Sequence, residues 1–219
     1  MKQIRKNVPS SFAQELREQT INLIKNYRIN TAEKNSEYGL WKNIKFDSNT
    51  GLLSIYSGEL NQTSLQSVNK HLVKKIRFFK GVKFPKCSSY LFADFISLIE
   101  IEGLEQVNTA QVNDISGMFK NCKSLSKLDL SHFDTSKVKY MNDLFSDNRS
   151  LKAITLGLKS QFSNKVYLPL VDIHLDKYTG RWIGKHSQNI YYDSYSFMTD
   201  YDGEVPDTYI WERKNHRNN

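Results

Sequence analysis

The side chains that most often carry out chemistry in proteins are sparse in this chain. It has five histidines in 219 residues, and none lies four residues from another histidine or from a cysteine, so a metal site has no local support. They are His71, His132, His174, His186 and His216. No nucleophile elbow, phosphate loop or dinucleotide fingerprint is present. We therefore expect a protein that is not an enzyme and has no catalytic residues, metal or cofactor.

Two cysteines, Cys87 and Cys122, are too few for a disulfide-dense scaffold or a four-cysteine zinc site. Both lie beside apolar residues, and nothing in their spacing demands a disulfide. We expect two buried free thiols, with a single disulfide as the alternative.

Acidic residues are dense near the C-terminus. Asp200, Asp202 and Gly203 resemble part of a calcium loop, although a plain turn is favoured because the alternating oxygen ligands are missing. No pair of carboxyl groups has a reason to differ in pKa, so a glycosidase pair has no support. Trp182 and Trp211 could be sugar platforms of a carbohydrate-active enzyme, but we favour core positions for them.

Basic residues give the chain a formal net charge of +8, which favours acidic partners. The densest basic patch accompanies phenylalanines, as in surfaces that bind single-stranded nucleic acid. An alternation of basic and apolar residues is also typical of a half-buried strand, which we favour. Binding of nucleic acid or another anionic polymer is therefore the alternative function. The patch consists of Lys74, Lys75, Arg77, Lys80 and Lys83.

A repeat in the middle of the chain indicates the architecture that must position these residues. Phe92, Phe119 and Phe145 are separated by 27 and 26 residues. Each is followed six residues later by leucine and nine residues later by isoleucine or leucine. A fixed period of this length predicts a solenoid, in which each repeat buries its apolar face against its neighbours. These positions are Leu98, Leu125 and Leu151, then Ile101, Leu128 and Ile154.

Each repeat contains two different patterns. LxxLDL predicts a short strand, whereas VKYMNDLF (138–145) has apolar residues at helical spacing and predicts a turn or two of helix on the opposite side. Thr135 or Ser136 could cap that helix, with Asp134 near its N-terminus. A strand and a short helix in each repeat are typical of leucine-rich repeats. The predicted fold is α+β, with about 2.5 repeats in 85–158 that require caps because roughly three are needed for stability.

The flanking segments would supply those caps. Residues 1–36 predict a basic lead-in and a helix, which Ser10 or Ser11 could cap. Residues 37–84 predict a β region with a hairpin around 47–51, in which Trp41, Ile44 and Phe46 face Leu53 and Ile55. Residues 159–219 predict an aromatic-rich module with a polar tail. In that module RWIG pairs with TYIW, and Ser194 caps a short helix.

The stretch DLSHFDTSKV (129–138), with Met141 and Phe145 after it, resembles the repeat of BspA-like leucine-rich-repeat surface proteins of Gram-positive bacteria. Met118, Phe119, Cys122 and Leu125 match the second part of that repeat. TGRW and DTYIW resemble the ends of a module near the C-terminus of such proteins. The resemblance covers about residues 38–211 and implies a buried Cys122.

The resemblance also implies surface display or secretion and a role in adhesion, through binding of a protein or glycan. The expected contacts are exposed polar positions of the strands. No apolar signal segment follows the basic N-terminus, and neither a sorting motif nor a transmembrane run is visible. A cytoplasmic location is therefore the alternative. The candidate binding face consists of Glu100, Glu102, Lys127, Asp129, Ser131, Lys152 and Thr155.

Overall fold

The computed structural model describes residues 18, 43–163, 165–174 and 177–214. The chain divides into two units, Met1–Lys42 and Asn43–Asn219. The helix expected within 1–36, apart from Glu18, and the side chain of Trp41 lie outside the described residues. The following description concerns the second unit.

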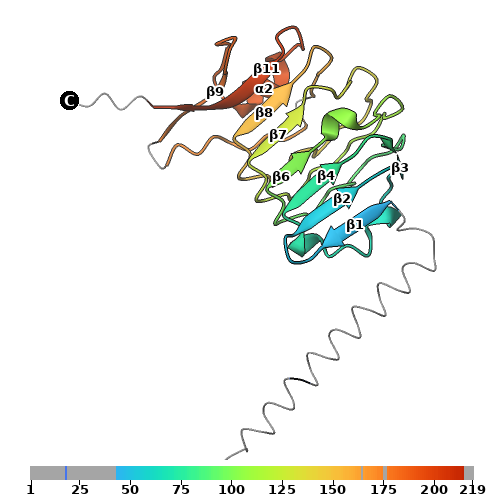
Figure 1. The fold of residues 1–219 in the computed structure, drawn as a ribbon. Coiled ribbons are helices and arrows are strands. Elements are labelled where there is room, and N and C mark those ends of the chain that lie inside the picture. Colours follow the sequence, from blue (N-terminus) through green and yellow to red (C-terminus); the bar gives the residue numbers. More distant parts are fainter. Residues whose placement is uncertain (1–17, 19–42, 164, 175–176, 215–219) are drawn as a thin grey trace, which may run out of the picture. The chain divides into compact units, whose positions relative to one another are not determined.

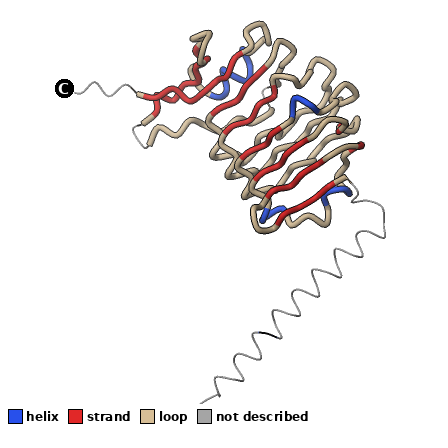
Figure 2. The backbone as a smooth tube through the Cα atoms, in the orientation of Figure 1, coloured by secondary structure: helices blue, strands red, loops and turns tan. Residues whose placement is uncertain are grey.

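The second unit is a mostly β solenoid (Figures 1 and 2). Each coil contributes one short strand, and the strands stack side by side along the solenoid axis. β2 (Leu52–Ile55), β4 (Lys75–Phe78) and β6 (Glu100–Glu102) form a parallel ladder. β7 (Lys127–Leu130) and β8 (Ala153–Leu156) form a second parallel ladder. The α+β expectation was right about the solenoid but overstated the helical share of the described residues.

Two-residue strands and single turns of 3-10 helix complete the coils. β3 (Gly58–Glu59) and β5 (Val82–Lys83) pair in parallel. The 3-10 turns are η1 (Thr63–Leu65), η2 (Lys70–Leu72) and η3 (Leu104–Gln106).

The solenoid begins earlier than the sequence repeat. Leu53 lies opposite Ile76, and Ile76 lies opposite Ile101, so the region expected to be a separate β cap already forms coils. These partners are 23 and 25 residues apart, whereas Leu128 and its partner Ile154 are 26 apart. Strand register is therefore kept although coil length varies, which is why periodicity alone missed the first coils.

β1 (Ile44–Asp47) forms the predicted hairpin with β2 at the start of the solenoid. Phe46 lies opposite Leu53, and Ile44 lies opposite Ile55. The Asp47 side chain fixes the turn by accepting a hydrogen bond of 2.9 Å from the Asn49 amide. The hairpin prediction is confirmed for its described residues.

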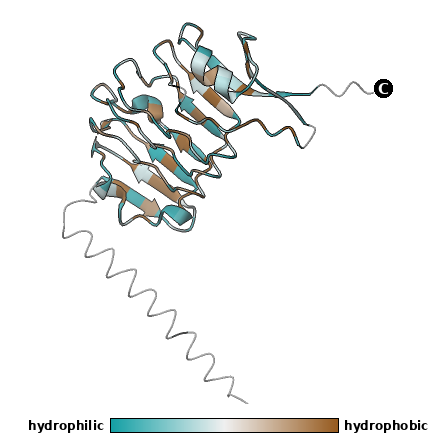
Figure 3. Cartoon of the chain, turned by 180° about the vertical axis from the view of Figure 1, so that it is seen from behind, coloured by the Kyte–Doolittle hydropathy of each residue, from teal (hydrophilic) through white to brown (hydrophobic). Residues whose placement is uncertain are grey.

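The core is organised around the repeated phenylalanines. Phe119 stacks on Phe92 with 5.7 Å between ring centroids and on Phe145 with 6.4 Å. All three rings are buried, as are Leu98, Leu125 and Leu151. Figure 3 shows hydrophobic and hydrophilic residues alternating along the strands, as expected when one side faces this core. The predicted core positions of the repeat are confirmed except for Ile101, which is half-buried.

The helix predicted at 138–145 is wrong, because this side of each coil is built from turns. Two backbone positions per coil, four residues apart, have positive φ, and an α-helix cannot continue through them. The amides bond to the next coil instead, as in Phe119 N–H to the Leu144 carbonyl at 3.1 Å. Asp134 forms a local turn by accepting from the Ser136 amide at 3.0 Å. The positive-φ positions are Tyr90, Gly117 and Asp143, then Asp94, Asn121 and Asp147.

The C-terminal module continues the solenoid sheet and covers its end. β9 (Tyr178–Gly184) and β11 (Asp207–Arg213) pair antiparallel, with Trp182 opposite Trp211. β11 also pairs antiparallel with β8, and β10 (Ile190–Tyr191) adds to the outer edge of β9. The pairing of RWIG with TYIW and the covering role of this segment are therefore confirmed.

The short helix α2 (Ser194–Asp200) packs on this hairpin as predicted, with the Phe197 and Trp182 ring centroids 5.3 Å apart. Its cap is Asp193 rather than Ser194. Ser194 is buried and accepts a hydrogen bond from Trp182 Nε1 at 2.9 Å. A buried indole N–H needs an acceptor. The Ser194 hydroxyl serves as that acceptor, and it does not cap the helix.

Asp207 secures the start of β11. Its buried carboxylate accepts hydrogen bonds from the amides of His186 and Ser187 at 2.8 and 2.7 Å and from His186 Nδ1 at 2.8 Å. Burial by itself raises the pKa of this group, but the bonds from Ser187 and His186 outweigh it and hold the pKa of Asp207 well below its usual range.

We expect this carboxylate to make the fold acid-sensitive. Because the pKa is lower in the folded than in the unfolded chain, its stabilisation is present above about pH 4 and is lost as the pH falls further, towards the folded pKa. Asp207→Asn should lower the free energy of unfolding by about 2 kcal/mol at pH 7 and flatten its decline in acid. Urea unfolding between pH 3 and pH 7 measures the free energy of unfolding of both proteins and its dependence on pH. If this free energy fell equally steeply in acid for the native protein and for Asp207→Asn, the result would contradict this role.

Candidate binding surface

The exposed side of the strands forms a polar face that crosses from the repeats into the C-terminal module. Alternate residues of β7 and β8 point away from the core, which places Lys127, Asp129 and Thr155 on this side. All three residues of β6 are half-buried, and Glu100 faces the same side as these residues. These four residues line one groove with a volume of about 470 Å³. Glu102 lies on the same strand as Glu100, so the structure brings five of the seven predicted residues onto one face.

The other two predicted residues lie apart from the groove. Ser131 follows the end of β7, and its amide donates to Asp129 Oδ1 at 2.9 Å. Lys152 precedes β8, and its Nζ lies 5.3 Å from the Trp211 ring centroid and 5.6 Å from that of Tyr178. Lys152 therefore packs against aromatic rings and does not line the strand groove.

The C-terminal module contributes groove residues that the sequence reasoning missed. Lys185, Thr208 and Ile210 line the groove together with the repeat strands. Thr208 Oγ1 lies 2.9 Å from Thr155 Oγ1 and so joins the two parts of the chain. In the structure, alternate residues of DTYIWER are half-buried. The sequence shows no such alternation, because Tyr209, Ile210 and Trp211 are consecutive, so only the pairing of β11 with β8 shows which residues reach the groove.

Ion pairs neutralise part of the predicted basic patch. Lys75 Nζ lies 2.6 Å from Glu102 Oε1 and 3.0 Å from Glu100 Oε2, and Arg77 Nε lies 2.7 Å from Glu102 Oε2. The Lys75 ammonium and then the Arg77 guanidinium lower the pKa of Glu102. The prediction of a half-buried strand is confirmed for β4, because Ile76 and Phe78 are buried between these charges.

The remaining basic residues of the patch do not continue this row. Lys74 precedes β4 and Lys80 follows it, while Lys83 lies on β5, which pairs with β3 in a separate ladder. The five basic residues therefore do not form one continuous strip of free cations.

The two tryptophans considered as sugar platforms are buried, and the segment considered as part of a calcium loop forms a turn. Trp182 and Trp211 are 0% and 4% exposed, so neither offers an open face for stacking a sugar ring. Asp202 accepts a hydrogen bond of 2.9 Å from the Glu204 amide beside Gly203, which forms a turn. Among residues 43–163, 165–174 and 177–214 there is no cluster of three histidine, cysteine or acidic side chains that could hold a metal ion.

The two cysteines differ in environment, and the expectation of two buried thiols is wrong for Cys87. Both are free, but Cys87 is exposed. It lies on the turn side of its coil, beside Asp114 of the next coil. Cys122 is buried, and its Sγ lies 3.1 Å from the Phe92 carbonyl oxygen, to which it donates. Burial raises the pKa of the Cys122 thiol to about 12.

Thiol reagents should therefore distinguish the two cysteines. We expect an aromatic disulfide reagent to modify Cys87 rapidly at pH 8 and to reach Cys122 only when the chain unfolds, because the thiolate is the reactive species. Cys87→Ser should remove the fast phase, and Cys122→Ser should leave it unchanged. Rapid modification of both thiols in the folded protein would contradict the buried position of Cys122.

The described part of the chain contains no helix with the length and hydropathy that a bilayer crossing requires.

Comparison with protein families gave a match to a family model described as "Mycoplasma protein of unknown function, DUF285", over residues 87–160. This segment contains the phenylalanine ladder and lies within the region of BspA-like resemblance, but it is less than half of the chain. The match does not point to Gram-positive BspA surface proteins in particular. Comparisons with curated proteins and with solved structures gave no match.

Proposed function

We propose that the protein is a non-enzymatic binding module and that its strand face takes a polypeptide ligand. The observation that carries this proposal is the groove that spans the repeats and the C-terminal module. It combines cationic and anionic groups, Lys127 and Asp129 among them, with apolar Ile210. Such a mixture suits a segment of protein chain, which offers charged, hydrogen-bonding and apolar groups together.

The scaffold supports such a role because it holds the groove in place. The strands beneath it are joined by parallel and antiparallel ladders, and their inward residues are packed in the core. A preformed surface loses little conformational entropy when a ligand binds. Lys127 has a side chain 67% exposed and Asp129 is also exposed, so both charges are accessible.

The repeats are, in this proposal, leucine-rich repeats of the BspA-like type, and the module acts in adhesion at a cell surface or after secretion. Support comes from the strand in each coil, the recurring leucine positions and the DLSHFDTSKV stretch. Localising the protein in its source cells by surface biotinylation tests this part.

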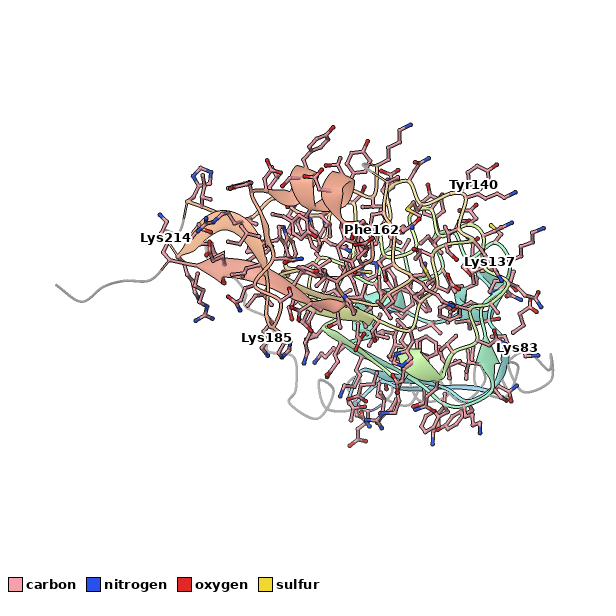
Figure 4. All side chains as sticks on the ribbon, turned by 90° about the horizontal axis from the view of Figure 1, so that it is seen from above. Lys83, Lys137, Tyr140, Phe162, Lys185 and Lys214 are labelled. Atoms are coloured by element: carbon pink, nitrogen blue, oxygen red, sulfur yellow. The ribbon has the colours of Figure 1, made fainter. Side chains whose placement is uncertain are left out.

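Selection from a displayed library of random peptides tests the strand face. We expect selected peptides to bind the whole protein with micromolar affinity and to lose about tenfold or more to Lys127→Glu. Lys137→Glu is the matched control, because Lys137 is also exposed but lies on the turn side (Figure 4). Selected peptides that bind both variants as well as the native protein would contradict the strand-face proposal.

The alternative, binding of an anionic polymer, makes a different prediction. A gel shift with single-stranded DNA should then weaken steeply as salt rises, because binding releases counterions. The ion pairs of Lys75 and Arg77 with Glu102 argue against it. A strong, salt-sensitive shift, together with no peptide selected, would favour this alternative.

A further inference from the structure

A second groove lies at the junction between the last phenylalanine-bearing coil and the C-terminal module. It has a volume of about 610 Å³ and shares no lining residue with the strand groove. One wall is the turn at 146–149, and the other is the loop at 167–172. Trp211 of β11 also lines it. This volume is within the range of sites that hold small organic ligands.

Two buried donors that line this groove have no partner among the described residues. Asn148 is 1% exposed and Trp211 is 4% exposed. The side-chain nitrogens Nδ2 of Asn148 and Nε1 of Trp211 make no hydrogen bond. Both nitrogens are almost completely shielded from solvent, so a ligand in the groove would contact the exposed atoms around them instead.

The orientation of the Asn148 amide is set by the fold. The buried Cys122 amide lies 2.8 Å from Asn148 Oδ1 and donates to it. A backbone N–H requires an acceptor, so the oxygen must face Cys122 and the NH₂ group must remain on the other side. This bond fixes the orientation of the Asn148 side chain.

The opposite wall holds an exposed aromatic ring. Tyr167 is 52% exposed and has a φ of 55°, a left-handed conformation that an aromatic residue rarely adopts. The loop that carries it is anchored on α2, because Ser194 Oγ donates to the Pro169 carbonyl at 2.6 Å. The Leu168 amide also contacts Met198 Sδ at 3.2 Å. The ring is therefore presented by a supported loop.

Charged groups of both signs complete the lining. Arg149 has a side chain 81% exposed and lies 4.0 Å from Asp147, which is too long for a strong ion pair. Asp172 lies on the other wall. The groove therefore presents donors and acceptors around an aromatic ring.

We propose that this junction groove binds a short saccharide of one or two rings. Sugar hydroxyls both donate and accept, so they can bond to Arg149 and to the carboxylates of Asp147 and Asp172 together. The C–H face of a pyranose ring can pack on the exposed ring of Tyr167.

An array of defined neutral, amino and acidic saccharides, probed with the whole protein, tests the proposal. The sugar that binds best is then titrated by calorimetry against the native protein and four variants. We expect Tyr167→Asn, in which asparagine tolerates the positive φ, to lose about tenfold in affinity. Arg149→Ala should also weaken binding, and both substituted side chains are exposed, so the fold should persist. Tyr140→Ala is the matched control, because Tyr140 is 58% exposed and lies on the turn side (Figure 4).

Absence of any sugar that binds tighter than millimolar would overturn the proposal. So would sugar binding that is unchanged by both Tyr167→Asn and Arg149→Ala. Peptides that compete at this groove and are lost in the same variants would show a polypeptide site instead. Lys127→Glu should leave sugar binding unchanged, so failure of this site and failure of the strand-face proposal can be told apart.

Discussion

Phe119→Ala is expected to lower the free energy of unfolding by about 3–5 kcal/mol, the usual cost of removing a buried aromatic ring. Phe119 is 1% exposed and is stacked between Phe92 and Phe145, at 5.7 and 6.4 Å. The neighbouring coils are fixed to one another by backbone hydrogen bonds, so they cannot collapse into the cavity. Loss of contact on both sides should therefore put the cost at the upper end of that range.

Urea unfolding of two control variants makes the measurement specific. Phe119→Leu keeps most of the apolar volume and should cost less than about 1.5 kcal/mol. Phe79→Ala removes the same ring from a position that is 36% exposed, where it stacks on Tyr56 at 4.7 Å. If Phe119→Ala and Phe79→Ala lowered the free energy of unfolding equally, the stacked phenylalanines would not be the structural centre of the repeats.

Gly103→Ala should destabilise the solenoid by about 3 kcal/mol or more, since it combines a left-handed backbone with a steric overlap. Gly103 follows β6 at a φ of 77°. A methyl group there would overlap the carbonyl oxygen of Phe78, a backbone atom of the preceding coil. The backbone of β4 is held by ladders on both sides, so it has little freedom to withdraw.

Gly81→Ala is the matched control for this substitution. Gly81 also has a positive φ, 100°, but the nearest atom to an added Cβ is Ser57 Cβ at 3.6 Å, an ordinary contact. It should therefore cost only about 1–2 kcal/mol for the backbone conformation. The difference between the two midpoints of thermal or urea unfolding measures the overlap between coils. Equal losses would show that Gly103 is required for its φ alone.

The strand positions of the repeat were predictable because they depend on short-range patterning. Leu128, Leu130, Ile154 and Leu156 alternate with polar residues, and their side chains are buried as a period of two requires. The turn side was misjudged because apolar residues at spacings of three and four fit inward-facing turns as well as a helix. The aspartate, asparagine and glycine at recurring left-handed positions held the distinguishing signal.

The residues of the strand groove were predicted in part for the same reason. Parity along β6, β7 and β8 identified Glu100, Lys127, Asp129 and Thr155. Parity gave the wrong location for Lys152, because the location of that side chain depends on where Tyr178 and Trp211 pack. Parity also did not predict Lys185 and Thr208, which reach the groove through the pairing of β11 with β8.

The sequence by itself determined the stacked coils, the phenylalanine ladder and the hairpin with its helix at the C-terminal end. These features follow from the spacing of apolar residues over short segments, which can be read directly from the sequence. Only the tertiary structure decided that the solenoid begins at β2, that the C-terminal module extends the polar strand face, and that the turn at 146–149 lies across the junction groove from the loop at 167–172. Those outcomes depend on hydrogen bonding and packing between segments far apart in the chain, where strand register and not sequence period determines which residues become neighbours.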